Sequence, residues 1–156
     1  MSNGIKLVSS IAICEAAGIL GSLFTESGAS SWYAGIVKPS FNPPSWVFAP
    51  VWTALFVLMG IALFLVWKRG GEAPGAKKAI LFFAVQLALN MLWSFLFFGL
   101  HSPLLAFIEI IVLWCAIIAT IFAYARVSRP AAYLLVPYLL WVTFAGYLNY
   151  TIWMLN

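Results

Sequence analysis

Five apolar runs, each about as long as a bilayer is thick, constrain this chain more than any other feature of its sequence. Charged and helix-breaking residues separate the runs into roughly residues 5–24, 46–67, 79–100, 104–125 and 131–155. About 20 apolar residues in a helix cross a hydrocarbon core of about 30 Å. The runs lack the apolar–polar alternation of barrel strands. The sequence therefore predicts an all-α integral membrane protein, a bundle of five transmembrane helices that forms a single domain over residues 1–156.

The overall composition agrees with this interpretation. Hydrophobic residues make up 65% of the chain and charged residues only 8%, and the mean hydropathy is +1.05. A soluble domain of this size has no interior large enough to hide so much apolar surface. The first run is not taken as a signal peptide, because Glu15 interrupts it.

The loops between the runs carry positive charge very unequally, which predicts an orientation. One side of the membrane holds seven cations and the other holds Lys38 alone; the seven are Lys6, Lys68, Arg69, Lys77, Lys78, Arg126 and Arg129. Short loops rich in Lys and Arg stay in the cytoplasm. We therefore expect a cytoplasmic N-terminus and an external C-terminus. Outside these loops the sequence has no basic patch, and we expect no nucleic-acid partner.

Residues that usually carry catalysis or bind metals are scarce. Cys14 and Cys115 both fall inside apolar runs, where a thiol packs as a small hydrophobe. His101 is interpreted as a loop residue, with a haem-iron ligand as the alternative. The sequence contains no catalytic triad, phosphate-binding glycine loop or metal-ligand spacing, so we expect neither a metal nor a resident cofactor.

The long loop of residues 25–45 is the first segment with a functional signature. Pro39, Pro43 and Pro44 fix three backbone angles there and hold the residues before them extended. A stiff external loop favours a lid over a cavity between the helices. The alternative is an interfacial anchor, since Trp32 and Tyr33 belong to residue types that favour the headgroup layer.

Polar and aromatic residues recur at helical spacing in three runs, which places each set on one helix face. The sets are Trp52 and Phe56; Gln86, Asn90, Trp93 and Phe97; and Tyr138, Trp141, Ala145 and Asn149. Amides at membrane depth are costly unless paired, so these should face the bundle interior. They either join helices or line a cavity for a flat, mostly apolar ligand.

Several ordered motifs then resemble one known family. The motifs are Lys38-Pro39-x-Phe41-x-Pro43-Pro44-x-Trp46-Val47-Phe48-x-Pro50-Val51-Trp52-Thr53, followed by Met59-Gly60-Ile61-Ala62; Gln86-Leu87-x-Leu89-Asn90-x-x-Trp93-Ser94; and Pro137-Tyr138-Leu139-x-Trp141-x-x-Phe144-Ala145-x-x-Leu148-Asn149. They resemble the loop and the helices of the translocator proteins, also called tryptophan-rich sensory proteins or peripheral benzodiazepine receptors. The similarity covers nearly the whole chain.

The resemblance implies a homodimer in a bacterial or archaeal cell membrane, with a pocket for tetrapyrroles such as protoporphyrin and for benzodiazepine-type drugs. It also implies that Trp52 and Trp141 match tryptophans linked to light-driven porphyrin breakdown. We therefore expect a porphyrin receptor, sensor or carrier; the alternatives are a light-dependent porphyrin-degrading enzyme, which is less expected, and a small-molecule transporter. The ligand-binding candidates are Tyr33, Lys38, Pro44, Trp46, Trp52, Asn90, Trp93, Phe97, Trp141, Phe144, Ala145 and Asn149.

Three further features leave alternatives open. Glu15 lies near mid-membrane and should hydrogen-bond an amide, hydroxyl or carbonyl group, although a proton-coupling role is also conceivable. Glu109 lies nearer the external end of its run, where it either meets Lys38 or lines the pocket rim. The small residues Ala17 and Gly21, like Gly18 and Ser22, permit close helix approach, either between two copies or within one chain. The resemblance also implies sterol binding in some family members, but no Lys or Arg follows Tyr150 to complete the pattern for it.

Overall fold

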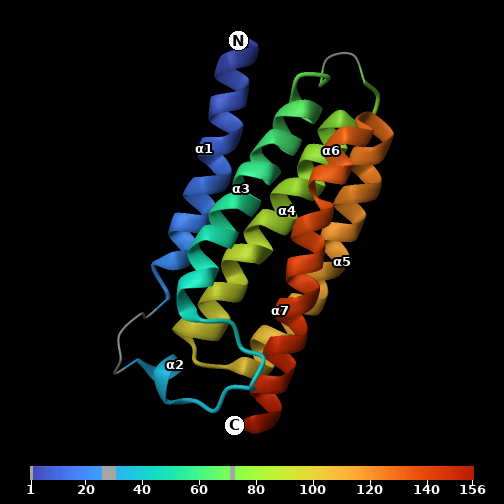
Figure 1. The fold of residues 1–156 in the computed structure, drawn as a ribbon. Helices are drawn as coiled ribbons and strands as arrows, with labels where there is room; N and C mark the ends of the chain where they lie inside the picture. Colours follow the sequence, from blue (N-terminus) through green and yellow to red (C-terminus); the bar gives the residue numbers. More distant parts are fainter. Residues whose placement is uncertain (1, 26–30, 71–72) are drawn as a thin grey trace.

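Long helices run side by side through the whole length of the molecule (Figure 1). The structure is a computed structural model that describes residues 2–25, 31–70 and 73–156. Within those residues, five helical segments are long and apolar enough to cross a membrane. The segments are α1 (Asn3–Ser22), α3 (Ser45–Trp67), α4 (Ala76–Ser94) with the π-helical turn η1 (Phe95–Gly99), α5 (Pro103–Val127), and α6 (Arg129–Leu134) with α7 (Val136–Leu155). The predicted all-α bundle is confirmed.

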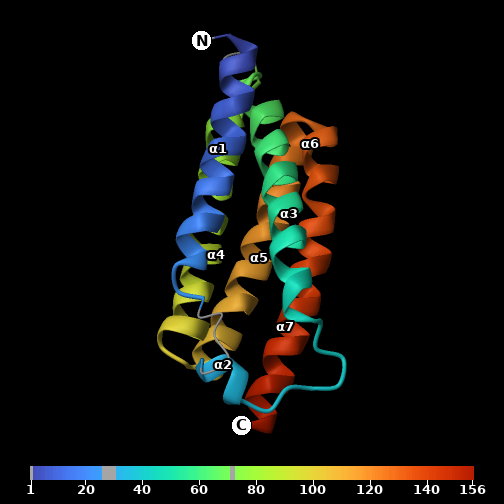
Figure 2. The ribbon, with the colours of Figure 1, turned by 60° about the vertical axis from the view of Figure 1, so that its left-hand side comes forward.

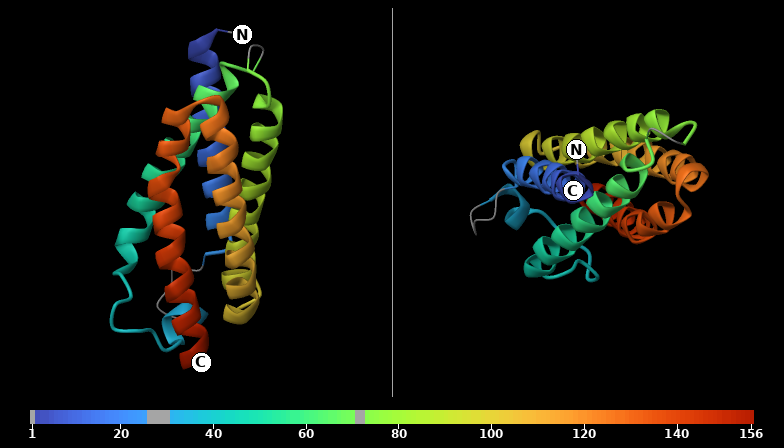
Figure 3. Two further views of the ribbon diagram at one scale, coloured as in Figure 1. Left: turned by 90° about the vertical axis from the view of Figure 1, so that its right-hand side faces the viewer. Right: turned by 90° about the horizontal axis from the view of Figure 1, so that it is seen from above.

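The helices pack mainly as neighbouring pairs. The most extensive contacts join α4 to α5, α1 to α3, and α5 to α7, and the view along the bundle shows this arrangement (Figure 3). The two chain ends lie at opposite ends of the bundle, as an odd number of spans requires. The short helix α2 (Trp32–Gly35) lies near the end where α7 finishes (Figure 2). We call this the lid end, and we call residues 31–44 the lid.

The outer surface of the bundle is apolar, as contact with lipid requires. Val8, Phe122 and Leu140 each expose 64–69% of their surface. In water, exposure of so many large apolar side chains would mark an aggregation site. In a bilayer the same side chains contact acyl chains. The backbone N–H and C=O groups must then form their hydrogen bonds within the protein, which helices achieve.

Most span bounds fall within two residues of the sequence prediction, and two spans differ in a more informative way. The third span begins at Ala76 rather than at residue 79, because Gly75 takes a left-handed conformation (φ 87°) just before it. Lys77 and Lys78 therefore stand in the first helical turn, where long side chains reach back to the polar surface. The fifth span is broken at Leu135, because Pro137 has no N–H to bond the Tyr133 carbonyl.

The small residues of α1 are used for packing within the chain. A Cβ atom at Gly60 of α3 would lie 2.6 Å from the Ile11 backbone, and one at Gly18 would lie 2.5 Å from the Phe56 ring. Gly21 similarly faces Ser94 at the end of α4. Of the two alternatives, the structure shows intramolecular packing on this face, and the homodimer stays a prediction.

The close approach of α1 and α3 predicts the effect of one methyl group. Gly60→Ala should lower the free energy of unfolding by roughly 1–3 kcal/mol, because the backbone of α1 must move away. The matched control is Gly146→Ala, whose new Cβ would meet only Ile110 Cγ2 at 3.7 Å. Thermal unfolding of both variants in one detergent measures the difference. Equal midpoints would contradict the close packing.

Candidate functional site

Trp52 of α3 and Trp141 of α7 come into contact across the bundle interior. Their ring centroids lie 6.5 Å apart and the ring planes meet at 89°. Trp52 also stacks on Phe56, with centroids 5.6 Å apart, and Trp141 contacts Phe144 at 5.5 Å. The two tryptophans to which the family resemblance assigns a shared role are therefore in direct contact.

A second aromatic group lies nearer the lid. Trp93 and Phe97 stack at 5.1 Å, and Phe97 meets the ring of Tyr33 from the lid at 6.1 Å. Phe48 of α3 packs against this group and also contacts Trp141 at 6.1 Å. The two groups therefore join, and we call their members the aromatic cluster: Tyr33, Phe48, Trp52, Phe56, Trp93, Phe97, Phe98, Tyr138, Trp141 and Phe144.

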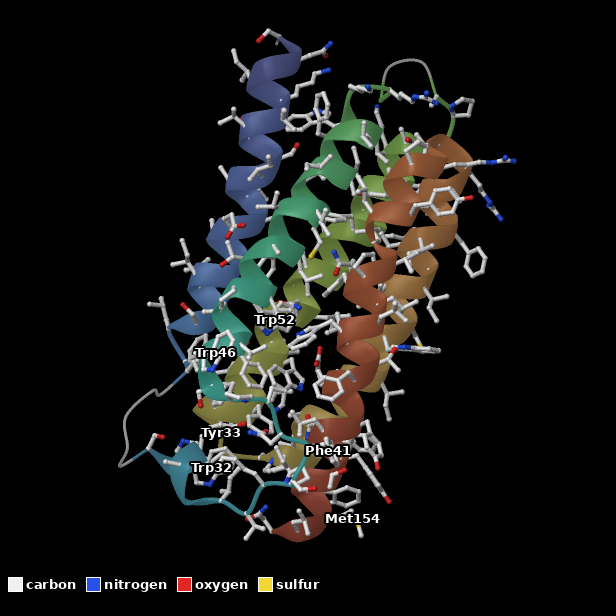
Figure 4. All side chains as sticks on the ribbon, viewed as in Figure 1. Trp32, Tyr33, Phe41, Trp46, Trp52 and Met154 are labelled. Atoms are coloured by element: carbon white, nitrogen blue, oxygen red, sulfur yellow. The ribbon has the colours of Figure 1, made fainter. Side chains whose placement is uncertain are left out.

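The cluster runs from the lid toward the middle of the bundle. In Figure 4, Tyr33 lies close to the lid end and Trp52 lies above it, toward the bundle centre. The rings touch one another at centroid separations of 4.9–6.5 Å. A flat ligand therefore enters this region only when some of the rings separate.

Two of the three predicted amides join helices beside the cluster. Asn90 donates to the Tyr138 hydroxyl at 3.0 Å, linking α4 to α7. Asn149 accepts from Trp93 Nε1 at 3.0 Å and donates to the Pro103 carbonyl at 2.8 Å, linking α4, α5 and α7. Both amides are buried, as predicted, and they serve as interhelical contacts.

Other buried polar groups near the interior have no hydrogen-bond partner among the described residues. They include both amide atoms of Gln86, both carboxyl oxygens of Glu109 and the Nε1 of Trp141. Glu109 is only 7% exposed and occupies the inner face of α5, between Ala106 and Ile110. Because an unpaired buried polar group costs free energy, such groups mark places where a polar partner is missing.

The lid is attached to the bundle by a few specific contacts. Val37 and Asn156 exchange two hydrogen bonds of 2.9 Å, so the end of α7 is joined to the lid. Tyr33 donates its hydroxyl proton to Asn42 Oδ1 at 3.1 Å, and Phe41 stacks on Tyr147 at 5.2 Å. Burial raises the pKa of the Tyr33 phenol, although the Asn42 hydrogen bond opposes this, so the phenol stays protonated.

The remaining predicted residues do not all reach the cluster. Trp46 is 75% exposed, and Pro44 is exposed where α3 begins. Ala145 lies between Trp141 and Asn149 on α7 and packs against the main core. Of the two alternatives for Glu109, the contact with Lys38 is not formed, because Lys38 donates to the carbonyls of Ala34 and Ile36 instead.

Two further residues that the sequence singled out are His101 and Glu15. His101 is exposed and stacks on Trp32 at 4.8 Å, which agrees with its interpretation as a loop residue. The Oε1 atom of Glu15 is buried, and in residues 2–25, 31–70 and 73–156 it meets no hydrogen-bond partner. Among the described residues, this oxygen therefore does not form the hydrogen bond expected for Glu15.

Sequence reasoning quoted Phe48 only as part of a family motif and did not single out Phe98, so neither was a candidate site residue. Phe48 precedes Trp52 and Phe56 at four-residue intervals, so helical spacing alone would have found it. Phe98 depends on η1, where the Leu100 N–H bonds the Phe95 carbonyl five residues back at 2.9 Å. The wider turn brings the adjacent residues Phe97 and Phe98 both into the cluster, which no α-helical pattern predicts.

The Asn149 contacts predict a loss of stability when the amide is removed. Asn149→Ala leaves the Trp93 N–H unpaired and removes a second hydrogen bond from the Pro103 carbonyl, so the free energy of unfolding should fall by about 1–3 kcal/mol. Thr151→Ala is the control, because Thr151 bonds only the Tyr147 carbonyl of its own helix. Chemical unfolding in detergent compares the two. Equal stability would show that Asn149 does not tie the helices together.

Comparison with known proteins places the whole arrangement in one family. Residues 10–154 match the model of the TspO/MBR family. The chain is 51% identical to a tryptophan-rich protein TspO of Chlorobaculum tepidum, over 94% of this chain and 92% of that protein. It is 47% identical to the Archaeoglobus fulgidus protein of the same name, over 99% of each. It is also 41% identical to the translocator protein of Bos taurus, over 89% and 83%. The chain therefore belongs to the TspO/MBR family.

Proposed function

We propose that this membrane protein is a receptor or carrier for flat tetrapyrroles such as protoporphyrin, and for benzodiazepine-type drugs, bound within the aromatic cluster. The observation that carries the proposal is the contact of Trp52 with Trp141 inside the bundle, 6.5 Å between centroids. Large aromatic faces from two helices offer stacking surfaces to a flat heteroaromatic ring.

The unpaired polar atoms beside these rings support the same ligand class. Trp141 Nε1 is a donor, Glu109 carries acceptors, and Gln86 supplies both. Protoporphyrin carries ring N–H groups and carboxylates on an otherwise apolar frame. Such a ligand would complete hydrogen bonds that are unmade in the described structure, which is how mostly apolar pockets obtain specificity.

The ligand enters the aromatic cluster at the lid end. Because the cluster rings touch one another, binding requires them to separate. Separation at the lid end breaks few specific contacts. They are the Val37–Asn156 pair and the Phe41–Tyr147 stack on α7, and the contacts of Tyr33 with Phe97 and Phe98 on η1. The prolines limit the conformations that the opened lid can adopt, so closure over the ligand costs less entropy.

Substitutions at Trp141 test the binding proposal. Trp141→Ala should weaken protoporphyrin binding by roughly 1–3 kcal/mol, the worth of stacking a base on an aromatic side chain, whereas Trp141→Phe should retain most of the affinity. Fluorescence titration in darkness measures both. The control is Trp114→Phe, because Trp114 lies on the outer side of α5 and bonds Thr143. An Ala variant that binds like the parent would contradict the proposal.

The same titration under light tests a second candidate function, porphyrin breakdown. The contact between the Trp52 and Trp141 indoles favours it, because a photoexcited porphyrin can take an electron from an adjacent indole. If the protein degrades porphyrin under light through the Trp141 indole, Trp141→Phe binds porphyrin but no longer converts it under illumination. Conversion at the parent rate in that variant would leave Trp141 as a wall of the pocket only.

We also propose that the lid faces outward from the cytoplasm. Lys6, Lys68, Lys77 and Arg129 belong to the ends of α1, α3, α4 and α6 farthest from the lid, while Lys38 lies in the lid. The positive-inside rule then assigns the lid end to the external side. A green fluorescent protein fused after Asn156 should stay dark, because it matures only in the cytoplasm, while a fusion at the N-terminus should fluoresce. The reverse result would invert the orientation.

A further inference from the structure

A groove opens at the end of the bundle opposite the lid, between the start of α4 and the end of α5. Its cavity volume is about 480 Å³, within the range of about 300–1,000 Å³ that small-molecule sites occupy. Its sides include Phe82 and Phe122, and the small side chains of Ala119 and Ala123 leave the space between them. It shares no residue with the aromatic cluster.

The apolar part of this groove faces the lipid. Phe122 is 67% exposed and Phe82 is 36% exposed, and both lie inside membrane-spanning helices. A water-soluble ligand would gain nothing from such walls, whereas an acyl chain lies along them without leaving the hydrocarbon.

The polar rim of the groove carries positive charge. Lys78 and Arg126 both line it, and Lys78 Nζ stands 5.8 Å from the centre of the Phe82 ring. Arg69 adds a third cation at the same edge, because its guanidinium donates to the carbonyl of Val127, another lining residue, at 3.0 Å. The carboxylates of the described residues, Glu15 and Glu109, belong to α1 and to the lid half of α5.

A cationic rim above an apolar, lipid-facing groove is complementary to an anionic phospholipid. We infer that this groove binds one phospholipid of that class, with the phosphate between Lys78 and Arg126 and an acyl chain along Phe82 and Phe122. Basic pockets between membrane helices hold anionic headgroups in this way. The last turn of α5 and the first turn of α4 place both cations at the depth of the headgroups.

The test compares two pairs of cations at the same end of the molecule. The full chain in detergent is titrated with phosphatidylglycerol or phosphatidylcholine, and bound lipid is counted by native mass spectrometry. The parent should bind one phosphatidylglycerol at least tenfold more tightly than phosphatidylcholine. K78Q/R126Q should lose roughly tenfold in phosphatidylglycerol affinity, while K77Q/R129Q, which removes the same charge outside the groove, should lose less than twofold.

Three results would overturn the inference. Equal losses in the two double variants would mean that general attraction, not the groove, holds the lipid. Equal binding of the two lipids would remove the role of the charge. Competition by inorganic phosphate at millimolar concentration would identify a soluble anion as the occupant instead. Ala123→Phe fills the groove and should also abolish one-to-one binding; if it fails to fold, the charge variants still decide.

Discussion

The side-chain amide of Asn149 is the contact on which the lid half of the bundle depends. No water reaches the hydrocarbon core to satisfy a polar group, so each one has to find its partner inside the protein. Asn149 does this between Trp93 Nε1 and the Pro103 carbonyl, and so fixes α4, α5 and α7 relative to one another. Aromatic contacts are weakly directional by comparison. The amide therefore holds the Trp93 ring in place, and the stack with Phe97 follows from that position.

The two ends of the bundle have different chemistry. From the lid end to the middle of the bundle, aromatic rings meet in the interior, and one of them, Trp141, carries an unpaired Nε1. At the other end, cations surround a groove that opens to the lipid between α4 and α5. The first arrangement suits a ligand that leaves the membrane surface and enters the protein. The second suits a lipid that stays in its leaflet. The proposals of tetrapyrrole binding and of phospholipid binding are therefore independent of each other.

Much of this fold was predictable from the sequence, because a membrane imposes its length on every span. The five spans and the burial of Asn90 and Asn149 follow from that constraint and from the cost of exposed amides. In a membrane protein the hydrophobic pattern does not distinguish the helix face that packs inside from the face that meets lipid, since both are apolar. For that reason the sequence did not show that the Gly18 face packs on Phe56, nor that Trp46 lies outside the cluster.

The π-helical turn at Phe95–Gly99 has a consequence for how the cluster changes shape. Such a turn holds one residue more than an α-helical turn, and one α-helical residue corresponds to about 100° of rotation. If the extra residue passes into the loop at His101, the side chains of Phe97 and Phe98 swing around the helix axis while the axis itself stays in place. The walls of the cluster can then be rearranged by a shift in register within one helix, without tilting any span in the membrane.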